Sequence, residues 1–464
     1  MSGLRIDLDW IARATGGRLI SGAGDLEVGA IVTDSRTAQA GDLFIALRGP
    51  RFDGHDFVAD VLARGVAGIV IEGGATVSVD AGGVIVTDDT LRALQDIGGA
   101  IRREAGTTVV AITGSAGKTT TKEAIAECLA TRFRVVKNKG NLNNHIGLPL
   151  SLTELRSKPD VAVMELGMNH AGEISTLVAI ARPNVRVWTN VGDAHIGFFE
   201  SADAIADAKA EILEDAGPDT VLVCNADDRR VMARVGRFNG RLVTFGTTGG
   251  ASVEARDIED LGLSGMRARV ATQAGERVVT TPLLGRGNLS NVLAAIAVSL
   301  ELGVPLDDVV ARVAALVPAS RRGAVRALRN GVRLVDDSYN SSPAALRRAL
   351  DVIGHEAGSR RVAVLGEMLE LGEHSTALHQ ECGRAVVQAG VARLFVVGGA
   401  PARALGDAAV AAGLDPAAVS WFETSDAAGP AVVSSITRGD LVLVKGSRGI
   451  RTDVVADRIV AELA

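Results

Sequence analysis

The chain has 464 residues, of which 47 % are apolar, and a formal net charge of −6. A chain of this length exceeds a single hydrophobic core, so we expect two to four domains. The acidic balance argues against a dominant nucleic-acid-binding surface, and no uncharged apolar run of about 18 residues predicts a membrane span. The charged start of the chain argues against a secretory signal, and three widely spaced cysteines argue against a disulfide framework or a zinc site. Together these features predict a cytoplasmic protein.

The first stretch, residues 1–86, is predicted to form a small α/β unit. The apolar segment 41–47 indicates a strand, and polar segments flank it. One of them contains Ser35 and Arg36, whose donor groups suit a phosphate or the edge of a heterocycle. A solvated turn is the alternative that composition alone favours.

From residue 87 to 317, strands and helices alternate, which is typical of a mainly parallel sheet covered by helices on both faces. Ligands of such sheets bind beyond the carboxyl ends of the strands. We expect strands at 109–112, 161–165, 185–190 and 220–224. The polar residues that follow these strands are therefore the candidates for a site.

A glycine-rich turn follows the first of these strands and leads into a helix. Gly114 and Gly117 allow the backbone to curl, so that its N–H groups point at phosphate oxygens. Lys118 is placed to reach the outer phosphates, and the Thr119 hydroxyl is placed to bind Mg²⁺. The general phosphate-loop pattern has a glycine where Ile112 stands, so a chance glycine-rich turn is the alternative. Lysine and threonine in register favour a nucleoside triphosphate site.

Other polar residues stand at the ends of predicted elements. Glu165 ends a strand and suits Mg²⁺, which prefers oxygen ligands. His195 follows the next strand along the chain, where it is a site candidate or only a loop cap. By composition, Lys209 is a solvated helix lysine, while Asn288 and Asn291 stand where a helix start needs caps.

Residues 137–145 are unusually rich in side-chain donors. They contain four Asn, two Lys and one His. A generic polar loop would rarely be so rich in amides, so we favour a contact with a diphosphate or a sugar. The residues that carry this prediction are Asn143, Asn144 and His145.

The last region, residues 318–464, is predicted to contain a second open α/β sheet. Its strands are expected at 332–335, 361–365 and 440–444, and a polar cluster follows each of them. Polar segments at one sheet edge again predict a site there. The region begins with Arg321, Arg322 and Gly323.

Three segments are distinctive in their amino-acid sequence and in their order along the chain: Asn141-Leu142-Asn143-Asn144-His145-Ile146-Gly147-x-Pro149, Asp337-Ser338-Tyr339-Asn340 and Lys445-Gly446-Ser447-Arg448. With the phosphate loop, they resemble the ATP-dependent Mur ligases of bacterial peptidoglycan synthesis over nearly the whole chain. Among these, the chain most resembles the members that join D-alanyl-D-alanine to UDP-N-acetylmuramoyl (UDP-MurNAc) tripeptide. The resemblance implies an α/β protein of three domains: an N-terminal UDP-substrate domain (1–86), a central ATP-binding domain (87–317) and a Rossmann-like C-terminal ligase domain (318–464).

The resemblance also implies roles for individual residues. It places ATP against Thr113, Gly114, Ser115, Ala116, Gly117, Lys118, Thr119, Asn291, Arg322 and Asp337. It places the other substrates against Ser35, Arg36, Asn143, Asn144, His145, Tyr339 and Asn340. It implies catalytic roles for Lys118, His195 and Lys209, and Mg²⁺ ligands at Thr119, Glu165, His195 and Lys209. Lys209 would serve as a carbamate, because a carbamate supplies an anionic oxygen whereas an ammonium repels Mg²⁺.

The implied reaction uses small-molecule substrates and no nucleic acid, in a protein expected to be a monomer. A peptide carboxylate would take the γ-phosphate of ATP, and the dipeptide amine would then displace phosphate. Family members usually have His where Gly287 stands, Ala-Asn where Ser341 and Ser342 stand, and Gly-Arg-Met near Arg322. A sibling ligase, such as one for folylpolyglutamate or cyanophycin, is one rival, and the N-terminal segment argues against it. The other rival is a P-loop switch that hydrolyses ATP only to change its conformation.

Overall fold

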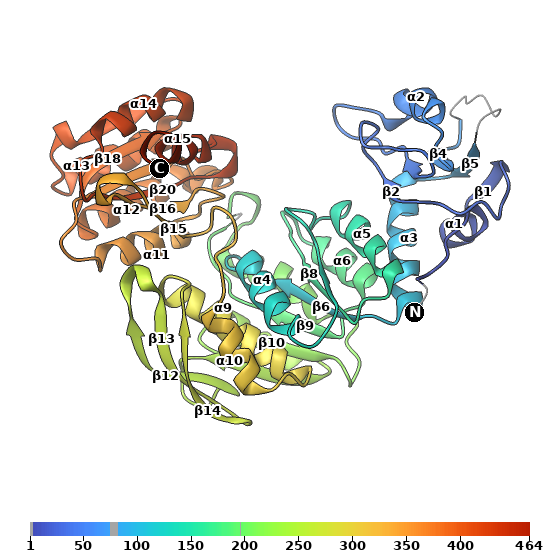
Figure 1. Cartoon of the computed structure of the whole chain (residues 1–464), viewed down its shortest axis with the longest axis horizontal. Helices are drawn as coiled ribbons and strands as arrows, with labels where there is room; N and C mark the ends of the chain where they lie inside the picture. The colour runs from blue at the N-terminus through green and yellow to red at the C-terminus, as the bar shows by residue number, and fades with distance from the viewer. Residues whose placement is uncertain (1–2, 75–81, 195) are drawn as a thin grey trace.

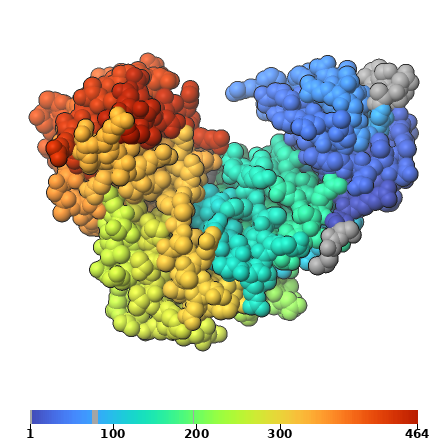
Figure 2. All heavy atoms as spheres, in the orientation of Figure 1, coloured from blue at the N-terminus to red at the C-terminus, as the bar shows by residue number. Residues whose placement is uncertain are grey.

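The computed structural model describes residues 3–74, 82–194 and 196–464. The chain forms three sheets of five, nine and six strands, one after another along the sequence (Figure 1). The N-terminal and C-terminal regions stand apart on either side of the middle region, and the space-filling view shows an open gap between them (Figure 2). No helix in the described part of the chain is long and apolar enough to cross a membrane.

The N-terminal sheet has the strand order β1-β5-β4-β3-β2. Neighbours from β2 to β5 are parallel, and β1 is antiparallel to β5. Its strands are β1 (Arg18–Ser21), β2 (Ile31–Val32), β3 (Leu43–Ile45), β4 (Gly68–Glu72) and β5 (Gly83–Thr87). The helices of this region are α1 (Leu8–Thr15) and α2 (Val58–Ala63), and α3 (Thr90–Ala105) leads into the middle region.

The middle sheet has the order β14-β13-β12-β11-β10-β9-β6-β8-β7. Its neighbours from β7 to β12 are parallel, and β12, β13 and β14 form an antiparallel meander, which confirms the mainly parallel sheet. The strands are β6 (Thr108–Thr113), β7 (Val135–Lys137), β8 (Val161–Glu165), β9 (Val185–Trp188), β10 (Val221–Asn225), β11 (Arg241–Gly246), β12 (Val253–Asp260), β13 (Met266–Thr272) and β14 (Gly275–Thr281). The helices are α4 (Lys118–Leu129), α5 (Gly147–Leu152), α6 (Glu173–Ala181), α7 (Ala202–Ala210), α8 (Arg229–Met232), α9 (Gly285–Glu301) and α10 (Leu306–Ala314).

Strand β6 is buried on both faces, as its continuous apolar run predicts. Successive side chains of a strand point to opposite faces of the sheet. Val109 and Ala111 pack into the core shared with α3, α5 and α6, whereas Val110 and Ile112 pack into the core shared with α4, α9 and α10. Ile112 is therefore a core residue within β6, and the positive φ angles of the loop come only later, at Gly114 and Gly117.

The C-terminal sheet has the order β15-β16-β20-β17-β18-β19, parallel except for the β15–β16 pair. Helices cover both faces, which confirms the second open α/β sheet. The strands are β15 (Ala324–Ala327), β16 (Arg333–Asp337), β17 (Arg361–Gly366), β18 (Val391–Val397), β19 (Val419–Phe422) and β20 (Leu441–Lys445). The helices are α11 (Pro343–Gly354), α12 (Ser375–Gln388), α13 (Ala400–Ala411), α14 (Ser425–Ser435) and α15 (Asp453–Leu463).

Several contacts join the C-terminal region to the middle region, and two of them are hydrogen bonds donated by backbone N–H groups. The Gly197 N–H donates to the Glu370 carbonyl oxygen at 3.0 Å, and the Leu263 N–H donates to Glu356 Oε1 at 2.7 Å. A Cβ on Gly197 would lie 2.5 Å from the backbone nitrogen of Gly372, so only glycine permits this approach. These contacts hold the C-terminal sheet edge opposite the phosphate loop.

The start of α9 differs from the prediction, whereas the state of the cysteines agrees with it. Helix α9 begins at Gly285, so Asn288 and Asn291 lie inside it, and the prediction that they cap its start is wrong. Cys128, Cys224 and Cys382 are free and buried, as the absence of a disulfide framework predicted. Burial raises the thiol pKa to about 12 for Cys128 and Cys224, and to about 11 for Cys382.

Candidate active site

The phosphate loop joins the end of β6 to the start of α4. Gly114 and Gly117 have φ angles of 149° and 83°, which side chains rarely permit. A Cβ on Gly114 would lie 2.0 Å from Thr189 Oγ1, and one on Gly117 would lie 2.3 Å from Asn291 Oδ1. The two glycines are therefore required both by the backbone angles and by the neighbouring strand and helix.

The side chain of Asn190 fastens this loop from the end of β9. Its Oδ1 accepts the Ala116 N–H at 2.9 Å, and its Nδ2 donates to the Ala116 carbonyl oxygen at 2.9 Å. Thr189 Oγ1 donates to the same carbonyl at 2.9 Å. We did not predict a role for Asn190, although an amide directly after a buried strand was a usable signal. The loop is thus held in its shape by the protein alone.

Glu165 lies at the end of β8, beside the loop, and is 5 % exposed. Thr119 Oγ1 donates to Glu165 Oε2 at 2.8 Å, and Asn143 Nδ2 donates to Glu165 Oε1 at 3.0 Å. The buried Asn138 side chain accepts the Glu165 N–H at 3.0 Å and so fixes the backbone there. A carboxylate and a hydroxyl beside a phosphate loop fit Mg²⁺, which takes few protein ligands and shares phosphate oxygens. Across the described residues, no group of three or more His, Cys, Asp or Glu is placed to hold a metal ion.

Lys118 folds back over the loop. Its Nζ donates to the Gly114 carbonyl oxygen at 2.8 Å. Burial lowers the pKa of this ammonium, Glu165 and Glu370 raise it, and Arg322 lowers it. A cation held at this point is placed to neutralise a phosphate bound by the loop.

Lys209 is the residue for which the composition-based prediction was wrong. The side chain is 1 % exposed rather than solvated, and its amine makes no hydrogen bond or ion pair with any described residue. Burial lowers the pKa of Lys209 well below its usual value, the nearby charge of Lys118 lowers it further, and Glu211 raises it. A lowered pKa increases the share of the uncharged amine, which is the form that reacts to give a carbamate.

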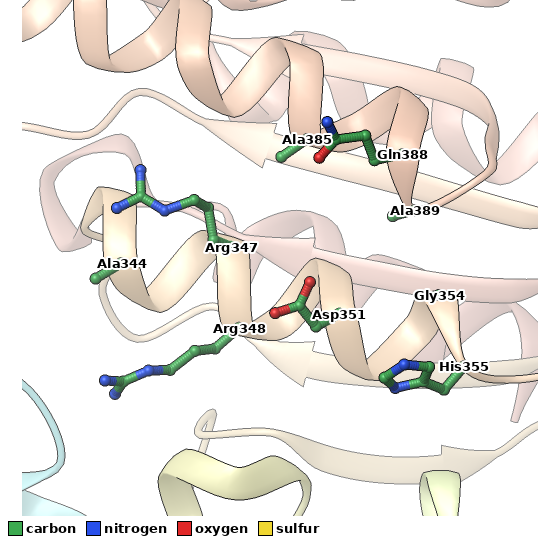
Figure 3. Close-up of a pocket in the computed structure, with 9 residues that line it drawn as sticks. All are labelled: Ala344, Arg347, Arg348, Asp351, Gly354, His355, Ala385, Gln388 and Ala389. Atoms are coloured by element: carbon green, nitrogen blue, oxygen red, sulfur yellow. The ribbon is translucent and has the colours of Figure 1, made fainter. Parts of the chain in front are cut away.

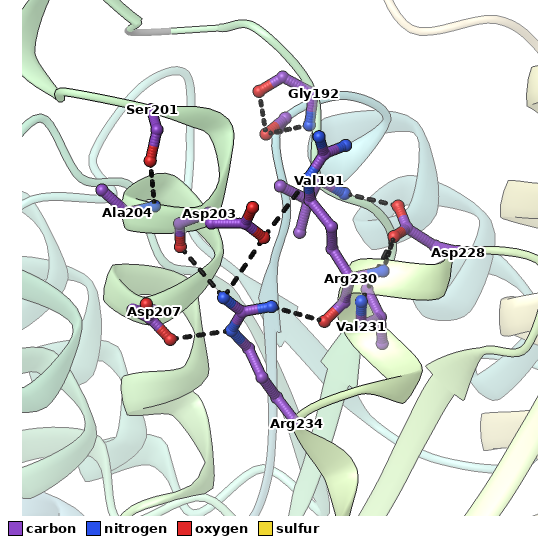
Figure 4. A network of polar contacts seen from close by, with 11 residues as sticks. Val191, Gly192, Ser201, Asp203, Ala204, Asp207, Asp228, Arg230, Val231 and Arg234 are labelled. Carbon is purple, nitrogen blue, oxygen red and sulfur yellow. Dashed lines mark hydrogen bonds and ion pairs between the residues drawn. The ribbon is translucent and has the colours of Figure 1, made fainter.

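Helix α7, which carries Lys209, is fastened on its outer face by Arg234 (Figure 4). Arg234 Nε donates to Asp207 Oδ1 at 2.8 Å, and Nη2 donates to the Asp203 carbonyl oxygen at 3.1 Å. In the same network, Asp228 Oδ2 accepts the Val191 N–H at 2.7 Å. The network connects α7 with the loop after β9. The predicted residue His195 lies in that loop but outside the described residues.

The C-terminal region contributes cations from the segment before β15 and from the end of β20. The Arg322 guanidinium carbon lies 4.2 Å from the centroid of the Tyr339 ring, and that of Arg448 lies 5.6 Å from it. Lys445 Nζ lies 2.6 Å from Asp337 Oδ2 and donates to the Asn340 carbonyl oxygen at 2.9 Å. These positive charges face the phosphate loop from the opposite side.

One cleft of about 910 Å³ brings most of the predicted residues together. Its lining includes Ser115, Ala116, Gly117, Lys118, Thr119, Asn143, Asn144, His145, Glu165, Asn291, Arg322, Asp337, Tyr339 and Asn340. Thr113, Gly114 and Lys209 are not part of the lining. Lys209 is nevertheless close enough to Lys118 for the charge of Lys118 to lower the pKa of Lys209.

Ser35 and Arg36 lie elsewhere, in the turn after β2. Arg36 Nε and Nη2 donate to Asp34 at 2.9 and 2.7 Å, and hydrogen bonds from Arg36 lower the pKa of Asp34 to about 2. The Ser35 carbonyl oxygen accepts a hydrogen bond from Arg64. This turn does not contribute to the cleft.

Comparison with known proteins assigns the family. Family models match in chain order: "Mur ligase family, catalytic domain" at 27–139, "Mur ligase middle domain" at 112–299 and "Mur ligase, glutamate ligase domain" at 321–448. The UDP-N-acetylmuramoyl-tripeptide–D-alanyl-D-alanine ligase of Bacillus subtilis is 33 % identical over 94 % of this chain and 94 % of its own. The chain belongs to the Mur ligase family.

Other Mur ligases are similar over most of their length. The Escherichia coli enzyme of the same name is 35 % identical over 81 % of this chain and 82 % of its own. A crystal structure of MurF from Acinetobacter baumannii has a TM-score of 0.89 and 32 % identity, and covers 99 % of this chain and 100 % of its own. MurF from Thermotoga maritima, solved in complex with ADP, has a TM-score of 0.82 and 29 % identity, and covers 93 % of this chain and 97 % of its own.

Proposed function

We propose that this Mur ligase joins D-alanyl-D-alanine to UDP-MurNAc-tripeptide with hydrolysis of ATP. One observation carries the proposal: a single cleft places the phosphate loop opposite Arg322, Arg448 and Lys445 of another region. Such a cleft can enclose a nucleotide and a phosphorylated substrate between two sheets. The names of the relatives supply the identity of the substrates.

The reaction proceeds in two steps. The terminal carboxylate of the tripeptide attacks the γ-phosphate of ATP, and ADP leaves with the electron pair of the broken P–O bond. The dipeptide amine then attacks the resulting acyl phosphate, loses a proton and expels phosphate. Lys118 and the loop N–H groups stabilise the charge of the transferring phosphoryl group, and such positioning and electrostatics dominate phosphoryl transfer.

Mg²⁺ would be held by Thr119, Glu165, His195 and a carbamate on Lys209. When bound, the ion neutralises charge on the β- and γ-phosphates. The buried position of Lys209 near Lys118 supports the carbamate. The ammonium form of Lys209 is repelled by the Lys118 cation, whereas a carbamate anion would be attracted to it. Catalytic roles then fall to Lys118, His195 and Lys209.

The remaining roles follow the same division. The nucleotide is bound by residues 113–119 together with Asn291, Arg322 and Asp337. The UDP-peptide and the dipeptide are bound by Ser35, Arg36, Asn143, Asn144, His145, Tyr339 and Asn340. We further propose domains at 1–86, 87–317 and 318–464, a monomer, and a cytoplasmic location, where ATP and nucleotide-linked precursors are available.

Phosphate release tests this function. Release should require ATP, UDP-MurNAc-tripeptide and D-alanyl-D-alanine together, and the product should be the UDP-MurNAc-pentapeptide by mass spectrometry. Single omissions and a panel of other peptides serve as controls. Equal release without either acceptor or donor would favour a P-loop switch, and ligation of glutamate to a folate would favour a sibling ligase.

A further inference from the structure

Helix α11 carries two adjacent arginines that point in different directions (Figure 3). Arg347 lies 3.6 Å from Glu381 and 3.8 Å from Asp193, and it lines a small cavity of about 480 Å³ between α11 and α12. Arg348 also lines the 910 Å³ cleft, together with the first turn of α9. The two side chains therefore offer a matched pair, with only Arg348 reaching the nucleotide cleft.

Arg348 lies over Gly287 in the first turn of α9. A Cβ on Gly287 would lie 3.1 Å from Arg348 Cδ and 3.2 Å from Nη1, which is tighter than ordinary contact. The guanidinium thus occupies the space that a side chain at position 287 would need. The resemblance to the family implies a His at this position, whereas in this chain the Arg348 side chain of α11 fills the space beside Gly287.

No described residue forms a hydrogen bond or ion pair with the Arg348 guanidinium. The side chain is exposed in the open cleft. Burial of its inner part and the charge of Arg347 lower its pKa, and Asp228 raises it. The group remains a cation at neutral pH and is available to a ligand.

The position of Arg348 along the cleft indicates which part of a nucleotide it meets. Asn291 contacts Gly117 of the phosphate loop, and Gly287 lies four residues earlier on α9, about 6 Å farther along the helix. The cleft lining near Arg348 includes the apolar residues Leu284 before α9 and Ala345, Ala349 and Val352 of α11, next to the polar Arg286, Asp351 and His355. Apolar side chains beside a planar cation suit an aromatic base, because a guanidinium stacks on an aromatic face.

We propose that Arg348 binds the nucleoside end of ATP, in the space left open by Gly287. The proposal rests on the proposed nucleotide function of the cleft and adds a specificity-determining residue to it. The guanidinium stacks on the base, and the apolar residues of α11 cover the edge of the ring.

Binding measurements test the contact without relying on turnover. Titration calorimetry would compare ADP with inorganic tripolyphosphate on the wild type, Arg348→Ala and the control Arg347→Ala. We expect Arg348→Ala to weaken ADP about 3- to 30-fold, the range of a cation–π contact, and to leave tripolyphosphate unchanged. Arg347→Ala should leave both ligands unchanged. Unchanged ADP affinity in Arg348→Ala, or equal weakening of tripolyphosphate, would overturn the proposal.

Substitution of the glycine tests the same contact from the other side. Gly287→Ala lies within a helix at an ordinary φ, so it should fold and displace Arg348. It should weaken ADP binding in the wild type but not in the Arg348→Ala background, and Gly287→His should partly restore binding in that background. If Gly287→Ala weakened ADP binding equally in the wild type and in the Arg348→Ala background, the proposed contact between the two positions would be contradicted. A wild type that binds ADP but ligates nothing would overturn the substrate assignment and leave this contact intact.

Discussion

The phosphate loop and the turn at residues 34–36 were both predicted from short polar motifs, but the structure places them differently. The phosphate loop is held by side chains from other strands, including the double hydrogen bond from Asn190 to Ala116. In the turn, the Arg36 side chain bonds to Asp34, two residues away, and to no other described residue, and it is 86 % exposed.

The phosphate loop has its binding geometry already formed, whereas the turn must rearrange its hydrogen bonds when a ligand binds. Rigid donors lose little entropy when a phosphate binds, so the loop is ready before the nucleotide arrives. The exposed arginine must exchange an intramolecular carboxylate for a ligand phosphate, which contributes little net free energy. We therefore expect substitutions in and beside the phosphate loop to affect turnover, and substitutions in the turn at residues 34–36 to affect substrate affinity.

The largest effect is expected for Lys118→Ala. It removes the charge nearest the bound phosphates, so kcat should fall at least about 100-fold, while thermal unfolding and UDP-peptide binding stay near wild type. Steady-state phosphate release and a melting curve measure both. A variant that retained a tenth of the activity would refute the preformed phosphate site.

Lys209 gives the next largest effect. Lys209→Ala and Lys209→Met should each lower turnover about 100-fold and remain folded, because the proposed carbamate is lost. Short-chain carboxylates should restore part of the rate only in Lys209→Ala, where the vacated space admits them. Full activity of either variant at limiting Mg²⁺ would contradict the role.

Asn143 and Asn144 line the same cleft as the phosphate loop, but they have different hydrogen-bond partners. Asn143 donates to Glu165, so Asn143→Ala should raise the KM for both Mg·ATP and the UDP-peptide severalfold. Asn144 Oδ1 accepts the Gly147 N–H at 2.8 Å, so Asn144→Ala should destabilise the fold by about 1 kcal/mol and raise only the UDP-peptide KM. An equal rise of both constants in Asn144→Ala would contradict this division.

The smallest effect is expected for Arg36→Ala. It should raise the UDP-peptide KM modestly and leave kcat unchanged, since the turn lies outside the cleft. Arg36 holds the pKa of Asp34 at about 2 instead of 3.8, so the pair stabilises the fold above about pH 4 and loses this contribution as the pH falls toward 2. Denaturant unfolding of both proteins at pH 7 and pH 3 should show the small difference shrinking. A constant difference would mean that Asp34 does not titrate with Arg36.

The phosphate loop was predictable because each residue has a local reason to be there. Gly114 and Gly117 need unusual backbone angles, and Lys118 and Thr119 follow at fixed positions on the helix. Glu165 was predictable because parallel strands bring their carboxyl ends to one edge. Such features depend on a few neighbouring residues or on sheet topology alone.

Lys209 could not be placed in this way, because its environment comes from distant segments. Its sequence neighbours are alanines and acids typical of a helix surface, and burial arises only when α7 packs against other elements of the middle region. The start of α9 was misplaced for a similar reason, since Gly285 turns the chain at φ 77° seven residues before the apolar run. Arg348 was not predicted as a site residue, because it lies against Gly287, which has no side chain to signal a contact.

The three buried thiols have a practical consequence. A thiolate is the form that alkylating reagents attack, and burial keeps Cys128, Cys224 and Cys382 protonated. Cysteines introduced at the exposed Ala59 of α2 and Ala412 after α13 would therefore be the ones to react with maleimide dyes in the otherwise unaltered chain. Energy transfer between the dyes would then report the width of the gap between the outer regions while the substrates are added one by one.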